Sequence, residues 1–216
     1  MDLSRAGKIF GPIILLCVVL LLPFLLFAQD LLAFGERFFL TERADISYMV
    51  GAALLLAGDS VLPTPSSVVA TLLATRVGFW PAAIANWAGM TAGCLLALWL
   101  GGGGRGALKR TGYDLPAPLI EWIERNGLLA TLLCRPVPVL AEATLILAGA
   151  AGIPRRLLLA LCAVANLALG CAYAYAGSGG NSGLIDPGAI LFGAAVIPVV
   201  MTIPVWLLSR VRDIGR

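Results

Sequence analysis

Long apolar runs alternate with short polar connections along this chain, a pattern typical of a protein that crosses a membrane several times. Four of the runs carry no charged residue, and each has the roughly 20 apolar residues that a helix needs to cross the hydrocarbon core. The first could instead be a cleaved signal peptide, but its length and its prolines Pro12 and Pro23 favour a retained helix. The pattern therefore predicts transmembrane helices over residues 9–29, 77–101, 157–176 and 189–209.

Two further apolar runs, residues 46–75 and 127–153, are interrupted near their middles. Gly58-Asp59, Pro63 and Pro65 break the first run, and Arg135, Pro136, Pro138 and Glu142 break the second. Each half is too short to cross the hydrocarbon core as a helix, and each whole run could cross only as a kinked helix with buried charge. The breaks favour two re-entrant hairpins.

The distribution of basic residues favours the same arrangement, because Lys and Arg gather on the cytoplasmic side of membrane proteins. With a cytoplasmic N-terminus and two hairpins that return to the side they entered from, eleven basic residues lie inside and only Arg37, Arg43 and Arg76 lie outside. If both broken regions crossed fully, Arg105, Lys109, Arg110 and Arg125 would lie outside. The predicted fold is therefore an all-α polytopic membrane protein with four spans, two opposed re-entrant helical hairpins and cytoplasmic termini.

The two broken regions resemble each other. Residues 63–81 and 136–154 are identical at six of nineteen positions, including a Pro-x-Pro and a third proline at equal distance. Opposed insertion of two such segments defines an inverted repeat, which is typical of transporters whose site lies between the broken elements. Coincidence in an apolar-rich sequence is the alternative. Because proline frees backbone carbonyls, we expect the turns to face each other or water. The predicted structural turn residues are Pro63, Pro65, Pro136 and Pro138.

Three charged residues, Asp59, Arg135 and Glu142, fall inside the broken regions. Each costs about 2.5–3.5 kcal/mol to insert, so such residues are usually paired and functional. The planar guanidinium of Arg135 suits a phosphate or carboxylate, and the two acids could balance its charge or be protonated when buried. The alternative is a salt bridge that only locks the hairpins together. Uncharged hydrogen bonds to a substrate are expected from Ser66, Ser67, Asn86 and Asn166.

The amino-acid composition excludes several other classes of protein. The chain is 60% apolar and 12% charged, which excludes a soluble globular enzyme, and a net charge of +3 excludes a nucleic-acid partner. It has no histidine, which removes imidazole bases and most zinc sites. Its five cysteines form no Cys-x-x-Cys pair. With no nucleophile and base set in view, we expect neither an enzyme nor a bound cofactor or metal.

Two motifs carry a family resemblance. Residues 58–67, Gly-Asp-Ser-Val-Leu-Pro-Thr-Pro-Ser-Ser, resemble the first hairpin of the DedA family, also called the SNARE-associated Golgi protein or VTT-domain family. Arg135-Pro136-Val137-Pro138, followed by Ala148-Gly149, resembles its second motif. The resemblance covers roughly residues 45–180. It divides the chain into an N-terminal helix (1–45), a DedA-like core (46–180) and a C-terminal helix with a basic tail (181–216).

The resemblance implies a protein of the bacterial inner membrane in which Asp59 and Arg135 are functional positions. Some members are implicated in returning undecaprenyl phosphate across the membrane, and eukaryotic relatives scramble phospholipids. Many members have a second acid where this chain has Ser66 and Ser67, and a second arginine where it has Ala141. These departures count against a mechanism that needs two acids in the first hairpin or two arginines on the phosphate.

The leading hypothesis is a flippase or scramblase for an anionic lipid phosphate, such as undecaprenyl phosphate or a phospholipid. A proton- or cation-coupled transporter of a small solute and a structural membrane protein are the alternatives. The expected partners are membrane lipids, with protons as a further candidate. The sequence leaves open whether the chain forms a homo-oligomer.

Overall fold

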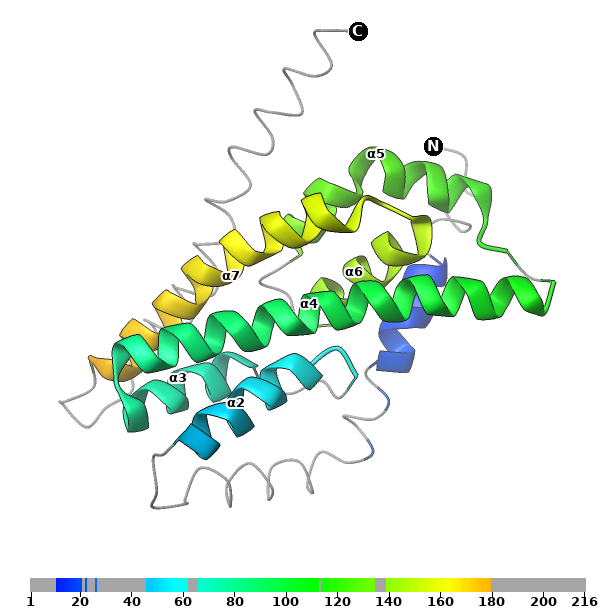
Figure 1. Ribbon diagram of the computed structural model, residues 1–216. Coiled ribbons are helices and arrows are strands. Elements are labelled where there is room, and N and C mark those ends of the chain that lie inside the picture. The colour runs from blue at the N-terminus through cyan, green and yellow to red at the C-terminus, as the bar shows by residue number, and fades with distance from the viewer. Residues whose placement is uncertain are drawn as a thin grey trace, which may run out of the picture.

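The computed structural model describes residues 11–20, 22, 26, 46–61, 66–112, 114–134 and 139–179 (Figure 1). All regular secondary structure in these ranges is helical, as predicted. The helix Gly11–Leu20 comes first. It is followed by α2 (Ile46–Gly58), α3 (Ser66–Val77), α4 (Phe79–Arg110), α5 (Ala117–Leu133), α6 (Leu140–Ala151) and α7 (Arg155–Ser178).

Two helices, α4 and α7, are long and apolar enough to cross a membrane. They match the spans predicted over residues 77–101 and 157–176. The span predicted over 9–29 is described only in part, as the helix Gly11–Leu20, and the one predicted over 189–209 lies outside the described residues.

The end predicted for the first of these spans, at Gly101, is wrong: α4 continues to Arg110 through four consecutive glycines. Glycine inside a helix costs about 1 kcal/mol relative to alanine, so the helix propensity of these residues favours a helix that ends at Gly101. Tertiary contacts override it, because Gly101 packs directly on the backbone of α6 and Gly102 lies against the side chain of Arg155. Position 101 has no room for a side chain, whereas a side chain at position 102 would require Arg155 to move.

The broken regions form helix pairs, α2 with α3 and α5 with α6, and the members of each pair contact each other. In the second pair the first helix begins at Ala117, because the short interfacial helix that the sequence predicts over residues 116–126 is continuous with the broken region predicted to start at residue 127. The reason is that Leu119 and Ile123 continue its apolar face and pack, fully buried, against Leu147 and Ala151 of α6.

The two halves of the core are built alike. The second helix of each pair, α3 or α6, has twelve residues and is followed by a glycine with a positive φ, Gly78 (φ 82°) or Gly152 (φ 83°). Glycine adopts this conformation without strain. A long helix then follows, α4 in one half and α7 in the other.

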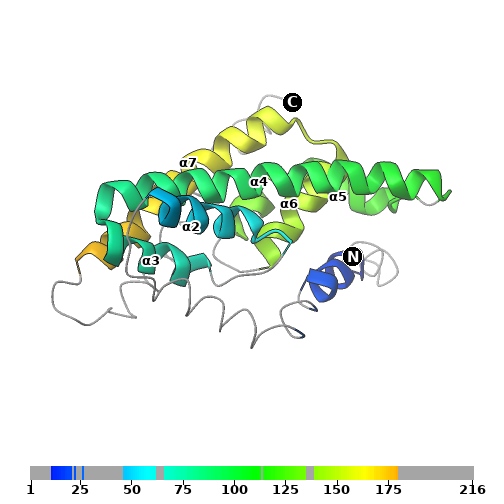
Figure 2. The same ribbon diagram turned by 60° about the horizontal axis from the view of Figure 1, so that its bottom comes forward.

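The halves also interlock. Helix α3 of the first half packs on α7 of the second, and α6 of the second half packs on α4 of the first (Figure 2). The long helices α4 and α7 run antiparallel and pack on each other along their middles, since Gly170 contacts Ala83 and Asn166 contacts Cys94. Each long helix is thereby held by a short helix from the other half.

Glycines stand where these helices cross. A Cβ at any of them would collide with the backbone of another helix, so the helices approach as closely as their main chains allow. Such small-residue contacts replace the hydrophobic driving force that is missing between helices in lipid. The crossings are Gly89 on α2, Gly101 on α6, Gly149 on α4 and Gly177 on α3.

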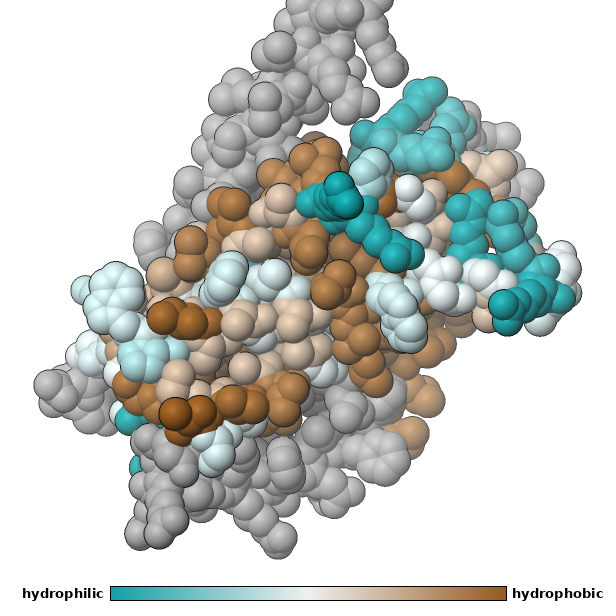
Figure 3. All heavy atoms as spheres, in the orientation of Figure 1, coloured by the Kyte–Doolittle hydropathy of each residue, from teal (hydrophilic) through white to brown (hydrophobic). Residues whose placement is uncertain are grey.

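Large apolar side chains lie on the outer surfaces of the long helices, and the space-filling view shows apolar colour over much of α4 and α7, interrupted by a hydrophilic patch at the start of α7 (Figure 3). Hydrophilic residues gather over the C-terminal end of α4 and over α5. An apolar surface of this extent is typical of contact with lipid. Its exposed members include Ile84, Leu95, Trp99, Leu157, Val164, Leu167 and Tyr175.

Candidate functional site

The first break begins at a turn that is held against α4. Asp59 is half-buried in this turn, directly after α2. The neighbouring Ser60 is 3% exposed, and its hydroxyl donates a hydrogen bond of 3.0 Å to the carbonyl of Gly93 in α4. The turn is closed by a second bond, from the N–H of Val61 to the carbonyl of Gly58 (2.8 Å). Ser60 thus fixes where Asp59 stands relative to α4.

Replacing Ser60 with alanine is expected to lower the free energy of unfolding by about 1 kcal/mol, the usual contribution of one hydrogen bond. Thermal unfolding in detergent measures the change. Thr75→Ala is the matched control, because Thr75 is exposed and the bond that the described part of the chain gives its hydroxyl is to the carbonyl of Leu72 in the same helix. Equal midpoints for the two variants would contradict the role given to Ser60.

The second break ends in a strained residue. Val139, which precedes α6, has φ 68°, a conformation that costs a β-branched residue about 1–3 kcal/mol. Its carbonyl accepts a bond from the N–H of Ala143 (2.9 Å), which starts the helix. Glu142 lies half-buried in this first turn, where the helix dipole favours negative charge.

The structure does not describe the centres of the two breaks. Arg135 and the four turn prolines predicted from the sequence, Pro63, Pro65, Pro136 and Pro138, lie outside the described residues. Ser66 and Ser67 are described and lie half-buried in the first turn of α3. The carbonyl of Ser67 accepts a 2.8 Å bond from the hydroxyl of Thr71.

Two asparagines form a polar centre between the long helices. Asn86 and Asn166 are both completely buried. The amide nitrogen of Asn86 donates to the carbonyl of Ala70 in α3 (3.1 Å), and that of Asn166 donates to the hydroxyl of Thr91 and the sulfur of Cys94 in α4 (3.3 Å each). Both side-chain carbonyl oxygens lack a hydrogen-bond donor within the described part of the chain. A buried unsatisfied acceptor costs about 1–3 kcal/mol, so each can accept a hydrogen bond from a ligand or water.

The middle of α4 is where these elements meet. Ser60 bonds to Gly93, Asn166 bonds to Cys94, and Leu145, one turn after Glu142, packs in the same apolar cluster as Cys94. The structure therefore brings the turn that carries Asp59, the side chain of Asn166 and Leu145 of α6 to one region of α4. Sequence reasoning missed Ser60 and Thr91. Ser60 could have been predicted as a candidate because it is the neighbour of Asp59. Thr91 could not, because its contact with Asn166 depends on the register of α4 against α7.

A separate set of contacts holds the far end of α4. Arg105 donates to the carbonyl of Ala150 at the end of α6 (2.9 Å) and lies 3.6 Å from the carboxylate of Asp114. Lys109 lies 3.7 Å from the same carboxylate. The N–H of Leu115, with smaller contributions from the two cations, holds the pKa of Asp114 below its usual value. These contacts tie α4 to α6 and to the connection before α5.

Fold and site together define an all-helical membrane protein in which two broken helix pairs interlock around two long antiparallel helices. Within the described ranges no group of three or more His, Cys, Asp or Glu side chains could hold a metal ion. The model of the VTT domain, the domain of the SNARE-associated and DedA proteins, matches residues 64–179, more than half of the chain. The chain therefore belongs to the VTT-domain (DedA) family. No curated protein and no solved structure matches it.

Proposed function

We propose that this protein is a lipid translocase of the flippase or scramblase type, acting on an anionic lipid phosphate such as undecaprenyl phosphate or a phospholipid. The observation that carries the proposal is the meeting of the first break, Asn166 and Leu145 of α6 at one region of α4. Polar groups gathered between broken helices at the centre of a helical membrane protein are typical of a transport site.

The proposed topology has four spans and two re-entrant hairpins, with both termini on the cytoplasmic side of a bacterial inner membrane. Helices α2, α3 and α6 have 13, 12 and 12 residues. At 1.5 Å per residue each is about 20 Å long, too short for a hydrocarbon core of about 30 Å. The antiparallel course of α4 and α7 supports insertion of the two halves from opposite sides.

In the proposed mechanism the chain binds and moves its lipid without covalent chemistry, enzymatic activity or a cofactor. Arg135 holds the phosphate, since its planar fork matches two phosphate oxygens, while the acyl tail stays in the surrounding lipid. Asp59 and Glu142 balance the charge of Arg135 when no substrate is bound. Uncharged hydrogen bonds to the lipid head group come from the polar side chains of Ser66, Ser67, Asn86 and Asn166.

A second candidate is a transporter of a small solute coupled to protons or another cation. The two buried amide oxygens of Asn86 and Asn166 favour it, because an acceptor without a donor can bind a protonated group or a cation. This candidate predicts uptake of a water-soluble cargo with a steep pH dependence that disappears in Asp59→Asn or Glu142→Gln.

The test of the leading proposal is lipid flipping in proteoliposomes by a triple variant, Asp59→Asn, Arg135→Gln and Glu142→Gln. We expect the variant to insert normally and to lose flipping. The control is the double variant Glu121→Gln and Arg125→Gln, which removes an exposed ion pair of 3.0 Å on α5 and should flip like the wild type. Full activity in the triple variant would show that the three charges do not act on the lipid.

A further inference from the structure

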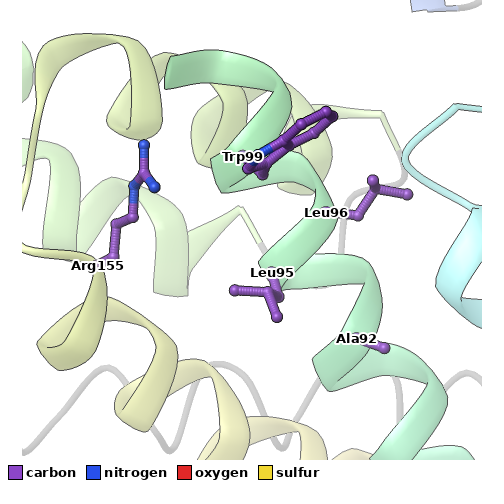
Figure 4. Close-up of a pocket in the computed structure, with 5 residues that line it drawn as sticks. All are labelled: Ala92, Leu95, Leu96, Trp99 and Arg155. Atoms are coloured by element: carbon purple, nitrogen blue, oxygen red, sulfur yellow. The ribbon is translucent and has the colours of Figure 1, made fainter. Parts of the chain in front are cut away.

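A hollow of about 340 Å³ lies on the outer side of α4, next to the first turn of α7 (Figure 4). Four of its lining residues, Ala92, Leu95, Leu96 and Trp99, follow one another on α4 at spacings of three, one and three. This spacing places them on one face of the helix. The fifth lining residue is Arg155, the first residue of α7 and the only charged residue at the hollow within the described part of the chain.

Arg155 extends from α7 to α4. A Cβ at position 102 of α4 would collide with its guanidinium, so the glycine there leaves the space that this side chain occupies. Arg155 is exposed, and among the described residues no hydrogen-bond acceptor or carboxylate is recorded for its guanidinium. An arginine with free donors at the edge of an apolar hollow has the chemistry to bind an anion that carries a hydrocarbon chain.

We propose that this hollow binds one anionic phospholipid, with its phosphate on Arg155 and an acyl chain along the α4 face from Ala92 to Trp99. The guanidinium fork matches phosphate geometry. The eight residues from 92 to 99 rise about 10 Å along the helix, a length that an acyl chain can follow. Trp99 is 63% exposed and adds an amphipathic ring suited to the membrane interface.

The surrounding charges favour an anionic lipid over a zwitterionic one. Arg156 is exposed beside Arg155, and the last turns of α4 carry Arg105, Lys109 and Arg110. Basic residues next to a span attract anionic lipids electrostatically. The bound lipid would join α4 to the start of α7 from outside, whereas Asn86 and Asn166 lie buried between those helices. The inference thus rests on the protein's place in the membrane and not on lipid translocation.

Native mass spectrometry of the detergent-purified full chain with phosphatidylglycerol tests the site. Arg155→Gln is expected to weaken binding about tenfold, the effect of losing one charge-assisted contact. Arg156→Gln removes the same charge from the adjacent residue, which does not line the hollow, and should weaken binding much less than Arg155→Gln, because only the general attraction of a nearby charge is lost. Ala92→Trp fills the hollow and should lose the lipid with Arg155 intact. Unfolding midpoints check that each variant folds.

Three results would overturn the site. Equal losses in Arg155→Gln and Arg156→Gln would indicate general attraction to a basic surface. Wild-type binding by Ala92→Trp would show that no acyl chain occupies the hollow, leaving Arg155 as a phosphate contact only. Equal affinity for phosphatidylcholine would contradict the preference for an anionic lipid. Flipping rates of the same variants, measured separately, report on translocation and leave the binding result unaffected.

Discussion

Arg135→Ala is expected to reduce lipid flipping about a hundredfold. An arginine that binds a phosphate through two charge-assisted hydrogen bonds contributes about 3 kcal/mol to the free energy of binding. Arg135→Lys should fail almost as completely, since an ammonium group keeps the charge but loses the bidentate fork. Both variants should still insert, because removing or moving one intramembrane charge does not raise the cost of insertion. Proteoliposome flipping assays and membrane fractionation measure the two effects.

Arg125→Ala is the matched control for this prediction. Arg125 lies ten residues before Arg135, and its side chain is 76% exposed and paired with Glu121 of the same helix. An exposed pair of this kind contributes only about 0.3–0.5 kcal/mol, so the variant should flip lipid normally. Unchanged flipping by Arg135→Ala would remove the residue from the proposed mechanism.

Gly149→Ala should destabilise the fold by about 1–3 kcal/mol, the typical cost of overpacking a buried contact. The new Cβ would meet the backbone of Leu98 at the crossing of α6 and α4, so the helices would have to move apart. Gly101→Ala should act similarly from the other helix, where the Cβ would meet the carbonyl of Ile146. Thermal or denaturant unfolding in detergent measures both changes.

The control for packing is Gly103→Ala, two residues further along α4. Among the described residues, a Cβ at position 103 meets no atom within 4 Å beyond its chain neighbours and the backbone of its own helix. Alanine is the better helix former by about 1 kcal/mol, so this variant should be neutral or slightly more stable than the wild type. If Gly149→Ala and Gly103→Ala changed the free energy of unfolding by the same amount and in the same direction, the close crossing of α4 and α6 would be contradicted.

The order of long and broken apolar runs was enough to predict much of the architecture. Charge-free runs predicted α4 and α7, and the interruptions at Gly58-Asp59 and after Cys134 predicted the two helix pairs. The shared spacing of prolines predicted that the two regions are alike, and their second helices, α3 and α6, each have twelve residues and are followed by a glycine, Gly78 or Gly152. These features follow from local composition and backbone chemistry, which are readable along the chain.

Features that depend on contact between distant segments could not be read in this way. The extension of α4 past Gly101 depends on its contact with α6, and the early start of α5 depends on the burial of Leu119 against α6. Asn86 and Asn166 stood out as polar residues in apolar spans. Their partners could not be predicted, because those depend on how α4 and α7 are rotated and shifted against each other.

The most direct measurement is flipping of head-group-labelled phospholipid and labelled undecaprenyl phosphate by the wild-type protein in proteoliposomes. A membrane-impermeant quencher reports which leaflet each label occupies, and protein-free vesicles set the baseline. Lipid translocation predicts that the protein makes label in both leaflets accessible to the quencher, and the lipid flipped faster identifies the class of substrate. Quenching confined to the outer leaflet for both lipids, with well-folded protein, would contradict it and favour the small-solute transporter.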